Sequence, residues 1–288
     1  MSTKKPFTKK NLDKYLLDLS KEYRRRSHGV PAEMIIIGGA SILINYGFRD
    51  MTYDIDAVYN ASSVMKESIN AIEDKYGLNR GWLNNDFVKT SSYTNKIFEV
   101  SEYYRTFSNV LQIRTVKAEY LVAMKLVSGR MYKKDMSDII GILQEQKENG
   151  KPLNYEMIDS AMVKMYNGWD RVSDASREFI TNALKMDDYS LEYQKVYENE
   201  QAVREEIEIF TKENPNQLNE DNINDIIEIA LSKKENAQIV DDNDKLPNEQ
   251  FEYSFEKDDD YDDENYQSQD EDDQSQDEDD DFEMDMTF

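Results

Sequence analysis

The 288-residue sequence lacks cysteine altogether and contains a single histidine, His28. The missing thiols exclude disulfides and thiolate metal sites, and one histidine excludes a metal centre built from several histidines. No segment approaches the roughly 20 apolar residues of a membrane-spanning helix, and the N-terminus has no apolar core of signal-peptide length. We therefore expect a cytoplasmic protein without a membrane partner.

Basic residues are scarce relative to acidic ones. The sequence has 35 Lys and Arg against 60 Asp and Glu, and its net charge at pH 7 is −25. Residues 241–288 hold 23 acids against Lys245 and Lys257, a net charge of −21, so the preceding residues carry only about −4. Such a stretch cannot bury enough apolar surface to order itself. We predict a disordered acidic tail over residues 236–288, which either solubilises the protein or binds a partner protein.

The periodicity of apolar residues predicts a mixed α/β body followed by helices. Strands are expected at residues 34–37, 53–59, 97–104 and 110–115, and helices at 8–26, 40–46 and 62–76. From residue 155 to 234 the pattern is helical throughout. We therefore divide the chain into an α/β domain over residues 1–150 that begins with a helix, a helical cap domain over 151–235, and the tail.

A strand-to-helix step with two glycines stands out within residues 34–59. The apolar run that ends at Ile37 is followed directly by Gly38 and Gly39, and then by a helical pattern. A helix that begins this way directs free backbone N–H groups and the positive end of its dipole at whatever lies beside it. Gly39 permits close approach of a phosphate, and Ser41 adds a hydroxyl donor. The step predicts a phosphate-binding turn, although two glycines alone are more often an ordinary turn.

Two aspartates, Asp54 and Asp56, lie on the next predicted strand. Residues two apart on a strand face the same side, so the two carboxylates are about 7 Å apart and repel each other unless a cation lies between them. Carboxylates together with substrate phosphates are the usual ligands of Mg²⁺. The pair predicts a site for Mg²⁺ or Mn²⁺. In so acidic a sequence, a solvated strand edge is the simpler alternative.

In this order and spacing, the glycine step and the Asp-Ile-Asp strand resemble the signature of the nucleotidyltransferase superfamily, hG[GS] followed by D-h-D. Within that superfamily they are similar to the bacterial branch that includes the AbiE-type toxins of type IV toxin–antitoxin systems. The resemblance implies a mixed sheet flanked by helices, with a helical cap that selects the acceptor. It also implies transfer of a nucleoside monophosphate from an NTP to an RNA acceptor such as tRNA, and growth inhibition countered by an antitoxin.

A second stretch, residues 117–143, resembles the AbiE-type pattern of a helix with Lys and Arg followed by a D-x-x-D helix. The resemblance implies that Lys125 neutralises the triphosphate during catalysis, and that Asp135 and Asp138 orient the cations. An ion-pair network on a helical hairpin is the alternative explanation. The predicted nucleotide- and phosphate-binding residues are Gly38, Gly39, Ser41, Arg49, Thr52 and Arg130.

A third carboxylate usually follows the aspartate pair in this superfamily, on a later strand. Asp86 and Glu99 are the candidates in this sequence. The segment around Asp86 also resembles a Trp-Leu-Asn-Asp motif of uncharacterised bacterial nucleotidyltransferase-like proteins, which implies that Asn84 and Asp86 face the cleft. The sequence departs from that motif because Asn85 stands where the family often has Asp.

In a second hypothesis, the protein has the nucleotidyltransferase fold but does not catalyse nucleotidyl transfer. If the third carboxylate is missing, the protein would bind nucleotide or nucleic acid as a regulatory protein, and the acidic tail would bind its partner. The position of a third acid relative to Asp54 and Asp56 distinguishes this hypothesis from that of an active nucleotidyltransferase.

Overall fold

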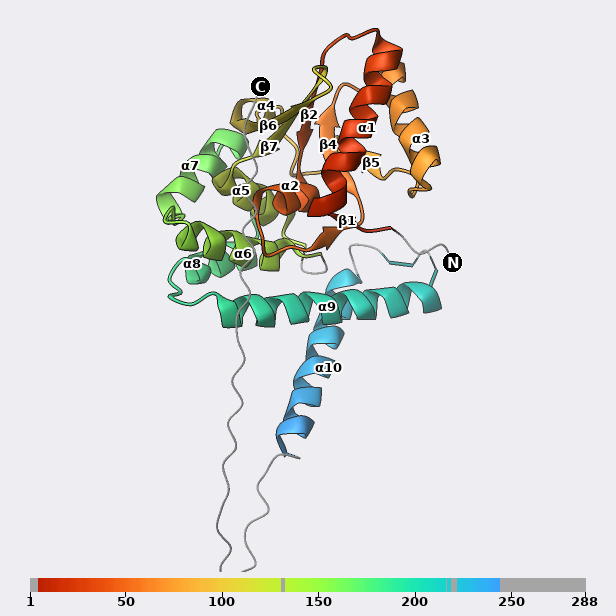
Figure 1. Cartoon of the computed structure of the whole chain (residues 1–288). Helices are drawn as coiled ribbons and strands as arrows, with labels where there is room; N and C mark the ends of the chain where they lie inside the picture. Colours follow the sequence, from red (N-terminus) through yellow and green to blue (C-terminus); the bar gives the residue numbers. More distant parts are fainter. Residues whose placement is uncertain (1–4, 131–132, 216, 219–221, 244–288) are drawn as a thin grey trace, which may run out of the picture. The chain divides into compact units, whose positions relative to one another are not determined.

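The computed structural model describes residues 5–130, 133–215, 217–218 and 222–243 (Figure 1). These residues belong to one compact unit, which spans residues 1–244. The predicted acidic tail, apart from its first eight residues, lies outside the described residues.

A five-stranded mixed sheet forms the centre of this unit, with the strand order β5-β4-β2-β7-β6. The strands are β2 (Ala32–Ile36), β4 (Ile55–Tyr59), β5 (Leu83–Asn84), β6 (Ser101–Phe107) and β7 (Leu111–Val116). The central strand β2 runs antiparallel to β4 and parallel to β7. Two further strands, β1 (Phe7–Thr8) and β3 (Met51–Thr52), form a small antiparallel sheet of their own.

Helices cover both faces of the sheet, as Figure 1 shows. The helices up to residue 128 are α1 (Lys9–Ser27), α2 (Gly38–Asn45), α3 (Ser63–Tyr76), α4 (Ile97–Val100) and α5 (Ala118–Ser128), with a 3₁₀ helix, η1 (Asp86–Lys89). The later helices are α6 (Asp135–Glu148), α7 (Tyr155–Tyr166), α8 (Asp174–Ala183), α9 (Ser190–Glu213) and α10 (Ile223–Asn243). The prediction of a mixed sheet flanked by helices and followed by further helices is confirmed.

Alternation along the strands assigns each face to a different set of helices. On β4, Ile55 and Ala57 belong to the hydrophobic cluster that α1 and α3 cover. Val58 belongs to the opposite cluster, which includes buried residues of α5, α6, α7 and α8. Asp56 lies two residues before Val58, so it shares the face that α5 and α6 cover.

The predicted strand over residues 97–104 is wrong in its first half. Residues 97–100 form the short helix α4, and the strand β6 begins only at Ser101. The apolar residues Ile97 and Val100 are both buried, and their spacing of three residues places them on one side of a helical turn, whereas on a strand they would face opposite sides. The burial of both Ile97 and Val100 is therefore explained by a helical turn at residues 97–100.

Helix α9 packs against α6, and α10 packs against α9. Glu200 of α9 is buried against α6, and Ile226 of α10 is buried as well. Helix α10 continues to Asn243, past the boundary of residue 235 that the sequence predicts for the helical part. The division into an α/β domain and a cap at residue 150 stays a prediction.

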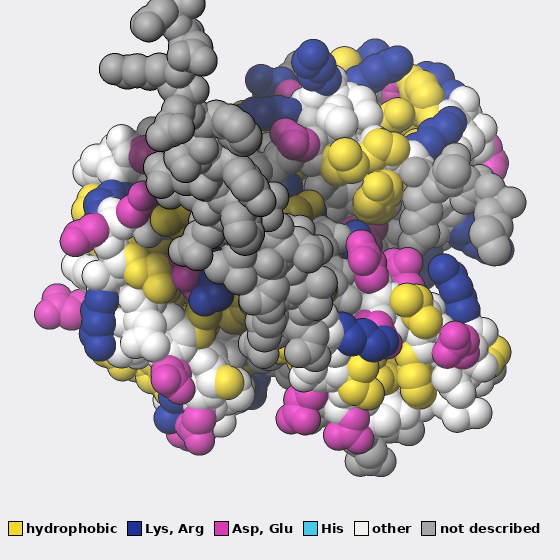
Figure 2. Space-filling view, turned by 90° about the horizontal axis from the view of Figure 1, so that it is seen from below, with side chains coloured by type: hydrophobic (Ala, Val, Ile, Leu, Met, Phe, Trp, Pro, Cys, Tyr) yellow, Lys and Arg dark blue, Asp and Glu magenta, His cyan; other side chains and the backbone are white. Residues whose placement is uncertain are grey.

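The described surface carries charges of both signs. Seen from below, acidic and basic side chains are interspersed with apolar ones (Figure 2). Among the described helices, none is both long enough and apolar enough to cross a membrane.

Candidate functional site

The strand-to-helix step, residues 37–39, forms a tight turn beside Asp56. The backbone N–H of Ile37 donates a hydrogen bond of 2.9 Å to the carbonyl of Asp56, and α2 begins at Gly38. Gly38 has a φ of 59°, a left-handed conformation that glycine adopts without steric cost. A Cβ atom at Gly38 would also lie only 3.2 Å from Oδ2 of Asp56. The turn therefore needs glycine both for its backbone and for the close approach of the Asp56 carboxylate.

The second glycine makes room for an arginine. A Cβ atom at Gly39 would lie 2.7 Å from Nη2 of Arg49 and 3.0 Å from Oγ1 of Thr52. Nη1 of Arg49 donates to Oδ2 of Asp138 at 2.6 Å, and Nε donates to the carbonyl of Met51 at 3.2 Å. Arg49 thus connects the first turn of α2 to helix α6, and its guanidinium is held in place from three sides.

The two hydroxyl residues of the predicted phosphate-binding set, Ser41 and Thr52, are buried. Ser41 is fully buried on α2, and its Oγ accepts a hydrogen bond of 3.4 Å from Nδ2 of Asn45. Thr52 is buried too, and its Oγ1 donates to the carbonyl of Asp54 at 3.2 Å. In this arrangement Thr52 supports the backbone that carries Asp54, and Ser41 supports the helix behind the turn.

The two aspartates differ in their surroundings. Asp54 precedes β4 and is exposed, whereas Asp56 lies within β4 and is half-buried. Burial raises the pKa of Asp56 above its usual value, and the charge of Asp54 raises it further. A hydrogen bond to Asn84 and the charges of Lys133 and Arg130 act in the opposite direction. The site therefore concentrates negative charge that a bound cation would offset.

The pairing of β5 with β4 brings Asn84 next to Asp56. β5 runs parallel to β4, and Asn84 lies opposite Asp56 in the register. The backbone N–H of Ile55 also donates to the carbonyl of Trp82 at 2.8 Å, which fixes this register. Asn84 thus lies beside Asp56, and its role at the cleft stays a prediction.

The two candidates for a third carboxylate lie apart from the aspartate pair. Asp86 begins η1, is largely exposed and forms an ion pair of 2.7 Å with Lys89. Glu99 lies on α4, not on a strand, and is exposed. Among the described residues, no group of three acidic or histidine side chains is arranged to hold a metal ion. Asp54 and Asp56 therefore stand as a pair in the described part of the chain.

Behind the turn lies a set of paired charges, which we call the ion cluster: Arg49, Lys125, Arg130, Asp135 and Asp138. Nζ of Lys125 lies 2.7 Å from Oδ2 of Asp138 and 3.1 Å from Oδ1 of Asp135. Nε of Arg130 lies 3.1 Å from the other oxygen of Asp135. The cluster joins α5 to the N-terminus of α6 and reaches the glycine turn through Arg49.

The two cations Lys125 and Arg130 of the ion cluster differ in their exposure to solvent. The Lys125 side chain is only 9% exposed, against 37% for Arg130. Burial alone would lower the pKa of Lys125, but the charges of Asp138 and Asp135 outweigh it, so the pKa lies above its usual value. Lys125 is thus a fixed cation within the protein. Arg130 and the exposed Lys133 are the cations that face solvent near Asp56.

Helix α9 supplies a residue that the sequence alone did not indicate. The Glu200 carboxylate accepts hydrogen bonds from the backbone N–H groups of Met136 at 2.8 Å and Ser137 at 3.3 Å, and from the Ser137 hydroxyl. These bonds cap the N-terminus of α6, where the ion cluster is anchored. Burial raises the pKa of Glu200 to about 7.

The sequence analysis named neither Glu200 nor Lys133 as a candidate site residue, although Lys133 lies within the stretch of residues 117–143. Glu200 follows Ser137 by 63 residues and lies in a helix rich in glutamate, so nothing local distinguishes it. Lys133 lies two residues before Asp135, where the D-x-x-D helix begins, and this position was the only available signal.

Comparison with known families identifies the family to which the chain belongs. Comparisons with curated proteins and with solved structures returned no match. A family model described as "Nucleotidyltransferase of unknown function (DUF6036)" matches residues 14–167, which include the glycine turn, both aspartates and the ion cluster. Helix α9, with Glu200, lies beyond the matched residues. The matched segment covers more than half of the sequence, and the chain belongs to this family of nucleotidyltransferases of unknown function.

Proposed function

We propose that the protein is a nucleotidyltransferase dependent on a divalent cation, which moves a nucleoside monophosphate from an NTP to an acceptor hydroxyl. The observation that carries the proposal is the close approach of the Asp56 carboxylate to Gly38, at the point where α2 begins. Among the described residues no side chain caps this helix N-terminus. A triphosphate and a cation would therefore meet where free N–H groups and two carboxylates converge.

The donor set fits Mg²⁺ or Mn²⁺. Asp54 and Asp56 provide hard oxygen ligands, and the raised pKa of Asp56 reflects in part the unbalanced charge of Asp54. A bound ion would neutralise phosphate charge and lower the pKa of the acceptor hydroxyl. Both aspartates would hold it, with the remaining positions left to phosphate oxygens and water.

The residues of the chain position the substrates. The backbone of Gly38 and Gly39 binds the β- and γ-phosphates, and Arg130 and Lys133 neutralise charge on the departing pyrophosphate. The acceptor oxygen forms a bond to the α-phosphorus while the bond from that phosphorus to the β-phosphate bridging oxygen breaks. The hydroxyl proton passes to solvent, and pyrophosphate leaves. Lys125 acts indirectly, because it fixes the aspartates that hold Arg49 and Arg130.

RNA, with tRNA as the first candidate, is the acceptor that the resemblance to AbiE-type proteins supports. The same resemblance supports growth inhibition countered by an antitoxin. The acidic tail is a candidate binding site for a partner protein.

One observation favours a second candidate function. In the described part of the chain, no third acid joins Asp54 and Asp56. A protein that binds nucleotide or nucleic acid without transferring it would need only the glycine turn and the cations. In that case the protein would act as a regulatory factor.

The transfer assay separates the two functions. Purified protein is incubated with Mg²⁺, bacterial total RNA and each α-labelled NTP in turn, beside an Asp54→Asn/Asp56→Asn variant. Label that enters RNA only with the unmutated protein supports the transferase and identifies its nucleotide. Nucleotide binding without any transfer would support the regulatory function.

A further inference from the structure

Helix α1 carries a row of cations along the side that faces solvent. Exposed basic residues recur at intervals that place them on one side of the helix, and we call them the basic stripe: Lys10, Lys14, Lys21, Arg24 and Arg25. The opposite side of α1 is buried against the sheet and α3. At 1.5 Å per residue, the stripe extends about 22 Å. It is therefore long enough to contact several phosphates of one nucleic-acid strand.

The acidic residues of α1 leave this row of positive charge in place, because they flank it and pair with other cations. Asp13 pairs with an arginine of β6 at 2.7 Å, and Asp18 pairs with a lysine of α3 at 2.8 Å. Glu22 pairs with Arg26 at 2.6 Å. Asp18 and Glu22 each contact one member of the stripe as well, at 3.2 and 2.6 Å, but those two cationic side chains are 60% and 67% exposed. Exposed pairs of this kind contribute at most about 1 kcal/mol, so a phosphate can replace the carboxylate.

The other members of the stripe have no acidic partner in the part of the chain that the structure describes. Nζ of Lys14 lies 5.3 Å from the centre of the Tyr76 ring, and Arg24 donates a hydrogen bond of 3.4 Å to the carbonyl of Ser108. Lys10, Lys14 and Arg24 can therefore neutralise a charge that comes from another molecule. A protein with a net charge of −25 needs such a local concentration of cations to hold a polyanion.

The stripe begins beside the aspartate pair. Strand β1 directly precedes α1 and pairs with β3, with Thr8 opposite Met51. Strand β3 in turn ends two residues before Asp54. Figure 1 shows the start of α1 next to β1 and α2. A nucleic-acid strand bound along the stripe would therefore reach the candidate metal site with one of its ends.

An exposed aromatic ring lies at this junction. Tyr53 directly precedes Asp54 and is 48% exposed. A line of cations next to an exposed ring is typical of surfaces that hold single-stranded nucleic acids, because every base has a face that can stack. An acidic polypeptide would use the cations alone. The combination therefore favours RNA over an acidic protein as the ligand.

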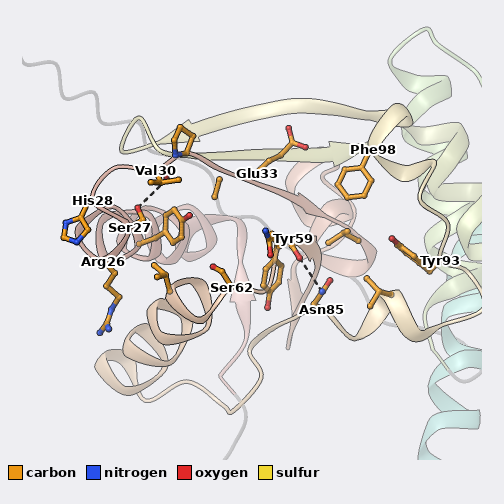
Figure 3. Close-up of a pocket in the computed structure, with 17 residues that line it drawn as sticks. Arg26, Ser27, His28, Val30, Glu33, Tyr59, Ser62, Asn85, Tyr93 and Phe98 are labelled. Atoms are coloured by element: carbon orange, nitrogen blue, oxygen red, sulfur yellow. Dashed lines mark hydrogen bonds between the residues drawn. The ribbon is translucent and has the colours of Figure 1, made fainter.

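The far end of the stripe is open to solvent. Helix α1 ends at His28, which is exposed and has a φ of 53°. Figure 3 shows His28 and Arg26 at one end of the cavity that the end of α1 shares with β4. Because Arg24, Arg25 and His28 are all exposed, an RNA longer than the stripe can continue past the end of the helix.

We propose that the basic stripe binds the phosphate backbone of the RNA acceptor, and that Tyr53 stacks against the base at the end of this RNA, beside Asp54 and Asp56. The statement that the bound RNA is the acceptor rests on the proposed function. RNA binding along α1 does not rest on it, because the stripe lies outside the glycine turn and the ion cluster.

The salt dependence of RNA binding tests the stripe. A short fluorescein-labelled single-stranded RNA is titrated with the full-length protein by fluorescence anisotropy, without divalent cations and at several KCl concentrations. Each phosphate that a cation neutralises contributes about −0.7 to the slope of log affinity against log salt concentration. Contacts by all members of the stripe therefore predict a slope of about −3.5.

Two triple variants measure the contribution of the stripe. The stripe variant combines three substitutions in α1: Lys10→Gln, Lys14→Gln and Arg24→Gln. The control variant reaches the same net charge through three exposed lysines outside α1: Lys151→Gln, Lys164→Gln and Lys195→Gln. The stripe variant should have a slope that is less steep by about 2 than that of the control, and an affinity at low salt that is about tenfold or more weaker. Equal slopes and affinities for the two variants would overturn the proposal.

Tyr53→Ala tests the stacking. It should weaken RNA binding by about tenfold and leave the slope unchanged, because stacking neutralises no phosphate. Tyr155→Ala, at a tyrosine of α7 that is 51% exposed, is the control and should change neither quantity. Urea unfolding of every variant confirms that it is folded. An undiminished affinity in Tyr53→Ala would refute the placement of the RNA end beside the aspartates.

Poly-glutamate distinguishes RNA from an acidic protein as the ligand. This polyanion has no bases, so it should displace the labelled RNA less than unlabelled RNA of the same total charge does. Equal displacement by the two polyanions would assign the stripe to an acidic protein and overturn the proposal.

The Asp54→Asn/Asp56→Asn variant keeps this test independent of the proposed function, because it should retain RNA binding that depends on the stripe. If transfer fails in every assay while RNA binding still depends on the stripe, the proposed reaction alone is wrong. If transfer occurs and the two triple variants bind RNA equally, the further inference alone fails.

Discussion

Replacing Gly38 with alanine tests the geometry of the turn most sharply. Alanine at a φ of 59° costs about 1 to 2 kcal/mol of folding free energy, because its Cβ disfavours the left-handed conformation. The same Cβ would lie 3.2 Å from Oδ2 of Asp56, so the carboxylate must move by a few tenths of an ångström. We expect Gly38→Ala to lower stability modestly and to weaken binding of the Mg²⁺–nucleotide complex strongly.

Gly77 provides the matched control. It ends α3 with a φ of 58°, and among the described residues a Cβ there would meet only Nζ of Lys5, at 3.6 Å. Gly77→Ala should therefore lose a similar amount of stability without any change at Asp56.

Two measurements separate the effects. Urea unfolding gives the free energy of unfolding, and calorimetric titration with Mg²⁺ and a non-hydrolysable NTP gives the affinity. Equal nucleotide affinities for Gly38→Ala and Gly77→Ala would refute the claim that the Asp56 carboxylate must lie against the turn.

Three further changes test the surroundings of the site. Lys125→Met should lower the free energy of unfolding by about 3 to 5 kcal/mol, because it leaves two buried carboxylates short of a cation; an unchanged urea midpoint would show that the lysine is not structural. Because the folded protein holds the Glu200 proton with a pKa of about 7, against 4.5 ordinarily, the free energy of unfolding should fall by about 3 kcal/mol as pH rises through this window. Unfolding curves at several pH values should show that fall, and Glu200→Gln should lack it; an identical pH dependence in the variant would contradict the assignment. Gly141→Ala would place a Cβ 2.5 Å from the Phe48 ring and should cost about 1 to 3 kcal/mol in urea unfolding, a loss that a Phe48→Leu background should reduce; additive losses would argue against this contact.

The sequence predicted the parts of the site that lie close together along the chain. The strand, the two glycines and the aspartates follow one another within residues 34–59, and each has a local signature. The spacing of acids and bases between Lys125 and Asp138 also indicated their pairing, which the sequence analysis held as one of two explanations.

Contacts between distant segments could not be predicted in the same way. Glu200 caps α6 from another helix, and only packing brings it there. The clearance that Arg49 requires over Gly39 depends on how the loop between α2 and β3 folds back. At residues 97–100, the apolar residues fit a short helix and a strand almost equally well in the sequence, and burial decided between them.

Binding of Mn²⁺ tests the central claim most directly, since electron paramagnetic resonance counts free Mn²⁺. The 23 acids of residues 241–288 will bind some Mn²⁺ by charge alone, so the informative quantity is the additional binding that a non-hydrolysable NTP induces. We predict a nucleotide-dependent increase in bound Mn²⁺ for the unmutated protein, and its loss in Asp54→Asn and in Asp56→Asn, both of which retain the tail. An increase that is the same in all three proteins would contradict the assignment of the two aspartates as the metal ligands.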